Sequence, residues 1–195
     1  MDTHYLDRLY HHIERRPDAV AFRAFNGGEA LTFSALDERA RCYGAGLQSL
    51  GVQRQDRVVA ILETSLSLPV VLLGHYALGA VHVPVNTRYG EVEIAHILED
   101  SGARVAVVDT LSMLELLRAL RQKNPAMLEH LILLGEAETR AELRDGEVFF
   151  SSLLEHAALE RRAEVDALAE SAGCEDKQLW TLVKTYEQRA RLNLQ

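Results

Sequence analysis

The feature that most constrains this 195-residue chain is the alternation of short apolar runs with helix-like segments between Asp56 and Asp109. The pattern predicts, in order, a strand over Arg57–Leu62, a helix over Ser65–Leu78, a strand over Val81–Val85, a helix over Glu91–Ser101 and a strand over Arg104–Val108. Such alternation favours parallel strands joined by crossover helices. The predicted fold class is therefore α/β with a mostly parallel sheet.

An N-terminal hairpin and two helices are expected before this block. The stretches Ala19–Phe25 and Ala30–Phe33 flank Asn26-Gly27-Gly28, a turn sequence typical of hairpins. A first helix is expected from Asp2 or Thr3 to about Arg16, and a second from Ser34, with Asp37 as a weaker capping box, to Gly51.

The chain is expected to change character after residue 150. Before it, the pattern predicts a helix over Ser112–Gln122, a strand over His130–Leu134 and a short strand over Glu147–Phe150. After it come two helical segments, Ser152–Glu170 and Glu175–Leu192, separated by Ser171-Ala172-Gly173. We therefore predict an α/β subdomain over 1–150 and a helical extension over 151–195 that ends in a helical hairpin.

The composition indicates a soluble globular protein and excludes some partners. Hydrophobic residues make up 48% of the chain and charged residues 26%, as in ordinary globular domains. The formal net charge of −8 argues against nucleic acid or an anionic membrane surface as the main partner. Cys42 and Cys174 are too few and too far apart for a disulfide framework or a zinc site, so buried thiols in a reducing compartment are expected.

One uncharged segment raises the question of a membrane span. Leu66–Val85 carries no formal charge over 20 residues, about the length that crosses a bilayer. It also contains Pro69, Pro84, Gly74 and Gly79, so a buried helix followed by a strand explains it better. Because the N-terminus lacks a basic region followed by an apolar core, no signal peptide is expected, and the expected location is cytoplasmic.

Five short motifs between about Thr32 and Asp109 resemble, in order and spacing, the beginning of AMP-forming acyl-CoA synthetases, the adenylate-forming ligases. They are Thr32-Phe33-x-x-Leu36, Gly51-Val52 with Asp56-Arg57-Val58, Gly79-Ala80-Val81-x-Val83-Pro84-Val85-Asn86-x-Arg88-Tyr89, Glu93-Ile94, and Leu98-x-Asp100-Ser101-Gly102-Ala103. The resemblance extends over about Ala19 to Leu134. It implies a parent chemistry in which ATP activates a carboxylate, with magnesium and coenzyme A as further ligands.

The family's chemistry depends on motifs that this sequence lacks. These are a Gly/Ser/Thr-rich loop ending in Lys that surrounds the ATP phosphates, a Thr-Glu pair for magnesium, an Asp for the ribose and a Lys on a mobile C-terminal domain. The nearest candidate for the phosphate loop, residues 182–189, has no glycine and carries Glu187, which would repel a phosphate. We therefore expect no catalytic, cofactor-binding or metal-binding residues in this chain.

Other candidate residues have simpler interpretations. Gly44-x-Gly46 lies within a predicted helix, so close helix packing is favoured over a dinucleotide fingerprint. Asp109 closes a strand where a ribose-binding acid could lie, but it could equally cap the next helix. His75, His82 and His96 are spread over three predicted elements, so we expect them to lie apart as satisfied or surface residues rather than as a metal cluster.

Two hypotheses about function follow. The first is a truncated or diverged acyl-CoA synthetase-like protein that does not catalyse alone. The alternative is an interaction module on a ligase scaffold, in which the Leu179–Tyr186 face and Trp180 form a homodimer or bind a full-length synthetase, although packing onto the domain is the simpler interpretation of that face. A small-molecule binder that keeps part of an acyl or nucleotide pocket is a third, weaker option.

Overall fold

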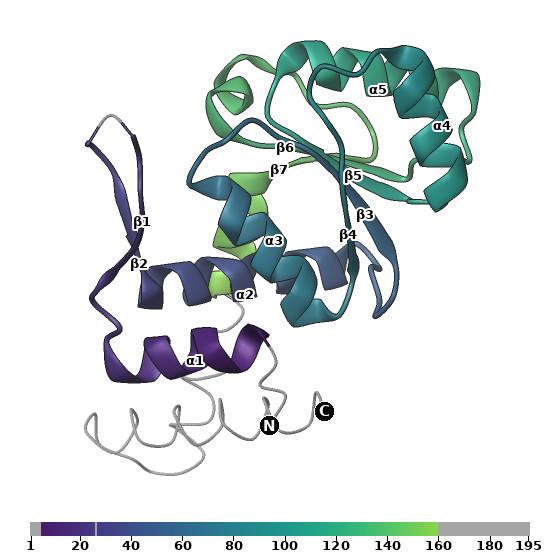
Figure 1. Cartoon of the computed structure of the whole chain (residues 1–195). Helices are drawn as coiled ribbons and strands as arrows, with labels where there is room; N and C mark the ends of the chain where they lie inside the picture. Colours follow the sequence, from purple (N-terminus) through teal and green to yellow (C-terminus); the bar gives the residue numbers. More distant parts are fainter. Residues whose placement is uncertain (1–4, 26, 160–195) are drawn as a thin grey trace. The chain divides into compact units, whose positions relative to one another are not determined.

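A five-stranded parallel sheet forms the centre of the protein in the computed structural model, which describes residues 5–25 and 27–159 (Figure 1). The residues up to Glu155 form one compact unit. The strands of this sheet are β3 (Arg57–Ile61), β4 (Val81–Pro84), β5 (Val105–Val108), β6 (His130–Leu133) and β7 (Glu147–Phe149). Two further strands, β1 (Val20–Arg23) and β2 (Ala30–Thr32), form a separate pair. The helices are α1 (Tyr5–Arg15), α2 (Phe33–Ser49), α3 (Ser67–Leu78), α4 (Glu91–Ser101), α5 (Leu111–Lys123) and the 3₁₀ helix η1 (Gly135–Arg140).

The sheet has the order β4-β3-β5-β6-β7, and every neighbouring pair is parallel. This confirms the predicted α/β class and the positions of all five predicted elements of the central block to within two residues. The predicted strand Glu147–Phe150 is one residue shorter, because Phe150 already begins a helix. The predicted helices that continue beyond residue 159 lie outside the described residues.

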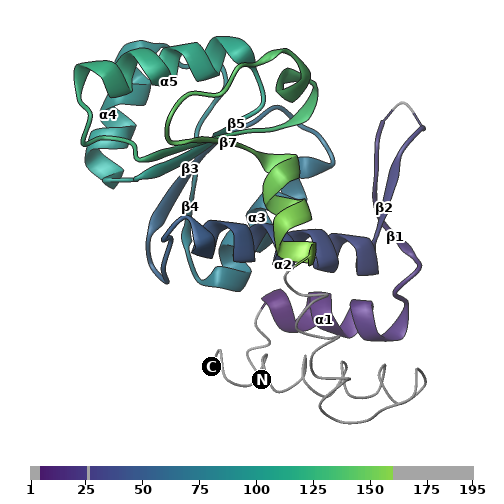
Figure 2. The same cartoon turned by 180° about the vertical axis from the view of Figure 1, so that it is seen from behind.

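Helices cover both faces of this sheet, as Figures 1 and 2 show from opposite sides. Alternate strand residues face opposite ways: Val58, Ala60 and Val107 belong to the core that packs on α2 and α3. Val59 and Ala106 belong to the core that packs on α4 and α5. Burial on both faces explains why these strands are continuous apolar runs in the sequence.

Later strands are placed on both sides of β3 in the sheet. The first crossover, through α3, places β4 on one side of β3, and the second, through α4, places β5 on its other side. The carboxyl ends of β3 and β5 therefore meet at a topological switch point. In open parallel sheets, ligands bind in the crevice outside such a point.

Glycines end two of these helices as predicted. Gly51 follows α2 with φ of 81°, and Gly79 ends α3 with φ of 73°, both in the left-handed region that favours glycine. The predicted start of α2 at Ser34 is wrong. Thr32 is its N-cap, and the Thr32 hydroxyl accepts a hydrogen bond from the Ala35 amide at 3.2 Å, whereas the Ser34 amide donates to the Pro17 carbonyl at 2.9 Å.

The predicted N-terminal hairpin is confirmed. Strands β1 and β2 pair antiparallel, with Arg23 opposite Ala30. Several apolar side chains of this hairpin are exposed: Val20 at 44%, Phe22 at 43% and Phe25 completely. None of the helices within the described ranges is both long and apolar enough to cross a membrane, so Leu66–Val85 folds as the expected helix and strand.

Candidate functional site

The candidate site is the carboxyl edge of the sheet at the switch point between β3 and β5. Three polar residues follow the strands that meet there: Glu63 after β3, Asn86 after β4 and Asp109 directly after β5. The Asn86 side chain accepts a hydrogen bond from the Arg88 amide at 3.0 Å and so shapes the turn that follows β4.

Asp109 joins the two central strands at this edge. One carboxylate oxygen, Oδ2, accepts a hydrogen bond from the Glu63 amide at 2.6 Å. The other, Oδ1, is buried and has no hydrogen-bond partner among the described residues. Asp109 does not cap α5, because Thr110 is the N-cap and accepts from the Met113 amide at 3.3 Å. Of the two interpretations from the sequence, helix capping is therefore wrong.

Burial raises the pKa of Asp109. The hydrogen bonds from the Glu63 and Asp109 amides act in the opposite direction, and the nearby charge of Glu63 raises the pKa further. Because Oδ1 is not exposed to solvent, a ligand would meet the charge of this carboxylate rather than its unpaired oxygen. Phosphate oxygens would be repelled by Asp109 and Glu63. The edge around Asp109 is therefore unsuited to a phosphate.

The histidines differ from the sequence-based prediction. His75 and His82 were expected to lie apart, but their Nδ1 atoms are 2.8 Å from each other, and His75 Nε2 lies 3.1 Å from the Tyr43 hydroxyl. The prediction was wrong because α3 leads into β4 through a tight turn at Gly79, which returns the chain past its own helix. His96 on α4 is exposed, and no group of three or more metal-ligating side chains occurs in the part of the chain that the structure describes.

Gly46 of α2 serves helix packing, as predicted, because a Cβ atom there would lie 2.9 Å from Leu153 Cβ. A Cβ atom on Gly44 would meet only ordinary contact, 3.4 Å from the Gly74 carbonyl oxygen. Cys42 is buried and is not in a disulfide, also as predicted, whereas Cys174 lies outside the described residues.

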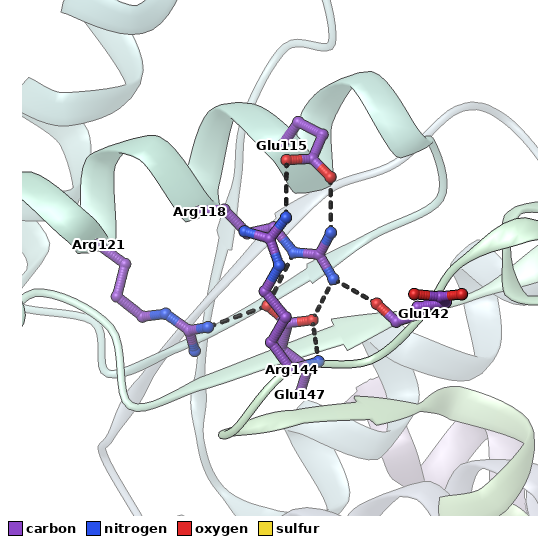
Figure 3. A network of polar contacts seen from close by, with 6 residues as sticks. All are labelled: Glu115, Arg118, Arg121, Glu142, Arg144 and Glu147. Atoms are coloured by element: carbon purple, nitrogen blue, oxygen red, sulfur yellow. Dashed lines mark hydrogen bonds and ion pairs between the residues drawn. The ribbon is translucent and has the colours of Figure 1, made fainter.

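The most extensive charge network joins α5 to β7 and is shown in Figure 3. The fully enclosed Glu147 carboxylate accepts hydrogen bonds from Arg118 Nε, Arg121 Nη2 and the Arg144 amide, each at 2.9 Å. Burial alone would raise the pKa of Glu147, but the hydrogen bonds from Arg118 and Arg144 outweigh it and lower the pKa. The carboxylates of Glu115 and Glu147 are paired with arginines of the same network, so we interpret it as structural.

The model of the family described as "AMP-binding enzyme" matches residues 9–170, which is most of the chain and includes the described sheet. The chain belongs to the AMP-binding enzyme family. The motifs from Thr32 to Ala103 that resemble adenylate-forming ligases occupy β2 to the turn before β5 in this family member.

Curated relatives of this AMP-binding family member include long-chain-fatty-acid–CoA ligases. The one from Escherichia coli O6:H1 is 38% identical over 104 residues, which cover 53% of this chain and 18% of that protein. The one from Yersinia pestis is 43% identical over 95 residues, covering 48% of this chain and 16% of that protein. The chain therefore matches less than a fifth of the length of these relatives.

A solved structure supports the same assignment for the fold. An anthranilate CoA ligase in complex with anthranoyl-AMP superposes with a TM-score of 0.67 at 27% identity, covering 77% of this chain and 27% of that one. The Asp109–Glu63 contact and the paired histidines of this AMP-binding family member were missed from the sequence. They arise from spatial neighbours that the sequence separates by 46 and 7 positions.

Proposed function

We propose that this chain supplies the N-terminal α/β part of an AMP-forming acid–CoA ligase and does not activate a carboxylate by itself. The observation that carries the proposal is the lack, in all 195 residues, of a Gly/Ser/Thr-rich loop ending in Lys. Catalysis of adenylation needs backbone amides and a cation around the pyrophosphate leaving group. The nearest substitute, residues 182–189, lies outside the described residues.

The candidate site supports this proposal. Its central residue, Asp109, accepts a hydrogen bond from the Glu63 amide, so the switch point carries two acidic side chains where a triphosphate needs amide donors and a cation. ATP, magnesium and coenzyme A would then be held by other parts of a ligase. Because the matched relatives are long-chain-fatty-acid–CoA ligases, fatty-acid activation in the cytoplasm is the parent reaction we propose.

The division into an α/β subdomain over 1–150 and a helical extension over 151–195 belongs to the same proposal. On this view, residues 1–150 provide the scaffold of the ligase part. The described residues up to Glu155 form a compact unit, so the scaffold is suited to fold without the remaining ligase segments.

Ligand-dependent melting of the 195-residue chain tests the proposal. A ligand that binds only the folded state raises the melting temperature according to its concentration relative to its Kd. Millimolar Mg·ATP, AMP, coenzyme A and a long-chain fatty acid are each expected to leave the melting temperature unchanged. An intact long-chain-fatty-acid–CoA ligase is the positive control, and a rise with Mg·ATP that AMP does not produce would show a phosphate site and overturn the proposal.

The alternative, an interaction module, has one observation in its favour. The hairpin exposes Val20, Phe22 and Phe25, and contiguous exposed apolar side chains mark contact surfaces. The face Leu179–Tyr186 and Trp180, which suggested a dimer or a full-length synthetase as partner, lie outside the described residues. Sedimentation equilibrium distinguishes the two: a dimer that Phe22→Ser dissociates favours the interaction module, and a strict monomer counts against it.

A further inference from the structure

Three side chains from three elements form a hydrogen-bonded row in the core. Tyr43 on α2 and His75 on α3 are fully buried, and His82 on the edge strand β4 is half-buried. The Tyr43 hydroxyl lies 3.1 Å from His75 Nε2, and His75 Nδ1 lies 2.8 Å from His82 Nδ1. We call these three residues the Tyr–His–His row. None of its three residues belongs to the candidate site.

Tight packing holds the row in this arrangement. Gly74 lets α3 approach α2 so closely that a Cβ atom there would lie 2.5 Å from Tyr43 Cδ1. The Tyr43 ring also packs against Phe150, with centroids 5.0 Å apart, and against His75 at 5.6 Å. The rings therefore have little freedom to find other partners.

When all three side chains are neutral, only one direction of the two hydrogen bonds pairs every buried donor and acceptor. If Tyr43 donates to His75 Nε2, then His75 carries its proton on Nδ1 and donates to His82 Nδ1, and every buried group is paired. In the opposite direction His82 donates to His75 and His75 donates to Tyr43. The Tyr43 hydroxyl proton then has no acceptor among the described residues, which is costly for a buried group.

Protonation of His82 forces that opposite direction. A histidinium donates from both ring nitrogens, so its Nδ1 can face His75 only if His75 Nδ1 becomes an acceptor. The row takes up one proton from water in this change. His82 then carries an N–H group on both ring nitrogens, and the single N–H of His75 is on Nε2, pointing at Tyr43. The alternative is that the contact between His75 and His82 breaks.

We propose that the Tyr–His–His row is a pH-sensitive switch in which protonation of His82 reverses both hydrogen bonds, leaves the Tyr43 hydroxyl without an acceptor and loosens β4 from the α2–α3 layer. Because β4 leads directly into Val85 and the turn at Asn86, the switch reaches the carboxyl edge of the sheet. The inference goes beyond the proposed function and does not depend on it.

Among the described residues, the hydrogen bonds of the two rings involve no charged side chain. On β3, the residue in register with His82 is Val58, which is apolar, and Arg57 on the opposite pleat donates to the Ser101 and Gly102 carbonyls. The remaining ionisable residues of the elements around the row are Asp37 and Arg41, which pair with each other, Glu38, Arg39 and Cys42 on α2, Tyr76 on α3, and Glu155 and His156 in the helix that begins at Phe150.

The electrostatics agree with this geometry. Burial lowers the pKa of His75 to about 3, with a further contribution from His82, and burial also lowers the pKa of His82. His75 therefore stays neutral across the physiological range, and His82, which is less buried, is the group that takes up the proton. Burial likewise raises the pKa of Tyr43, which keeps its hydroxyl protonated.

Imidazole ¹⁵N NMR and amide hydrogen exchange of the full chain between pH 7.5 and 5 test the switch. At pH 7.5, His75 is expected to carry its proton on Nδ1 and His82 on Nε2. As His82 titrates, the His75 proton should move to Nε2 or its bond to His82 should vanish, and protection of the β4 amides should fall at least tenfold relative to those of β5. A His75 proton on Nε2 at pH 7.5, or β4 protection that follows β5 throughout, would overturn the proposal.

Two variants separate the switch from a merely structural role. In Tyr43→Phe, His75 Nε2 has no partner whether the row is neutral or protonated. Protonation of His82 then costs less than in the wild type, so the pKa of His82 should rise. The control Tyr76→Phe, on the exposed face of α3, should leave the pKa of His82 unchanged. In His82→Gln the pH dependence of β4 protection should disappear. An unchanged pKa of His82 in folded Tyr43→Phe, or retained pH dependence in His82→Gln, contradicts the proposal; the wild-type spectra decide it if a variant does not fold.

Discussion

Glu147 is an enclosed carboxylate on β7 that two arginines of α5 neutralise. Removing one partner of a buried ion pair leaves the other charge uncompensated, which costs about 3–5 kcal/mol. We expect Glu147→Gln to lower the free energy of unfolding by about 3 kcal/mol, measured by urea denaturation at pH 7. Glu115→Gln is the matched control: it contacts the same Arg118 but is 59% exposed, so a change below about 1 kcal/mol is expected. Equal effects of the two substitutions would contradict the structural role of the network.

His75 and His82 make the stability of the fold depend on pH. Both have a pKa below the ordinary value of 6.5, so the unfolded chain binds more protons than the folded one as soon as the pH falls below about 6.5. The free energy of unfolding therefore keeps its full value above that pH. It decreases as the pH falls towards the lowered pKa values, about 3 for His75. Each histidine contributes a slope of up to about 1.4 kcal/mol per pH unit.

Urea denaturation at pH 7.5 and pH 5 measures this slope. His82→Gln should reduce it, because one of the two titrating groups is removed. His96→Gln, at an exposed position of α4, should leave it as in the wild type. A slope that neither substitution changes would show that the acid sensitivity comes from elsewhere in the chain.

The contact between α2 and α3 depends on the lack of a side chain at Gly74. A Cβ atom there would lie 2.5 Å from Tyr43 Cδ1 and 3.0 Å from the Ala40 carbonyl oxygen, so the helices would have to separate. Overpacking of this kind costs about 1–3 kcal/mol, and Gly74→Ala is expected to lower the melting temperature. Gly44→Ala meets only ordinary contact at 3.4 Å and gains helix propensity, so it should be neutral or stabilising. Equal melting temperatures of Gly74→Ala and Gly44→Ala would contradict the requirement for glycine at position 74.

Elements with a strong local pattern were predictable from the sequence. The strands β3 and β5 are short apolar runs between turn residues, and Gly51 and Gly79 mark helix ends through backbone conformations that other residues avoid. The start of α2 was less predictable, since Thr32 and Ser34 are both good caps and the choice depends on the distant Pro17 carbonyl. Local sequence carries no information about that partner.

The candidate site was predictable only in part for a related reason. The position of Asp109 at the end of a strand was visible in the sequence, but its bond to the Glu63 amide depends on the order in which β3 and β5 are placed in the sheet. The contact between His75 and His82 depends likewise on the turn at Gly79. Both contacts follow from topology, which the pattern of apolar residues does not specify.

At the scale of the whole molecule, the chain belongs to the AMP-binding enzyme family, and its matched part covers less than a fifth of the relatives' length. We propose that this part is scaffold and that adenylation requires segments it lacks. An exchange assay is the most direct test, because ATP–pyrophosphate exchange reports adenylate formation without the later transfer to coenzyme A.

The measurement is carboxylate-dependent ATP–[³²P]pyrophosphate exchange by the purified 195-residue chain, with Mg²⁺ and a series of fatty and aromatic acids. An intact long-chain-fatty-acid–CoA ligase serves as the positive control. We expect no exchange above that of a blank without protein, at any chain concentration. Exchange that requires the acid and increases in proportion to the concentration of this chain would contradict it.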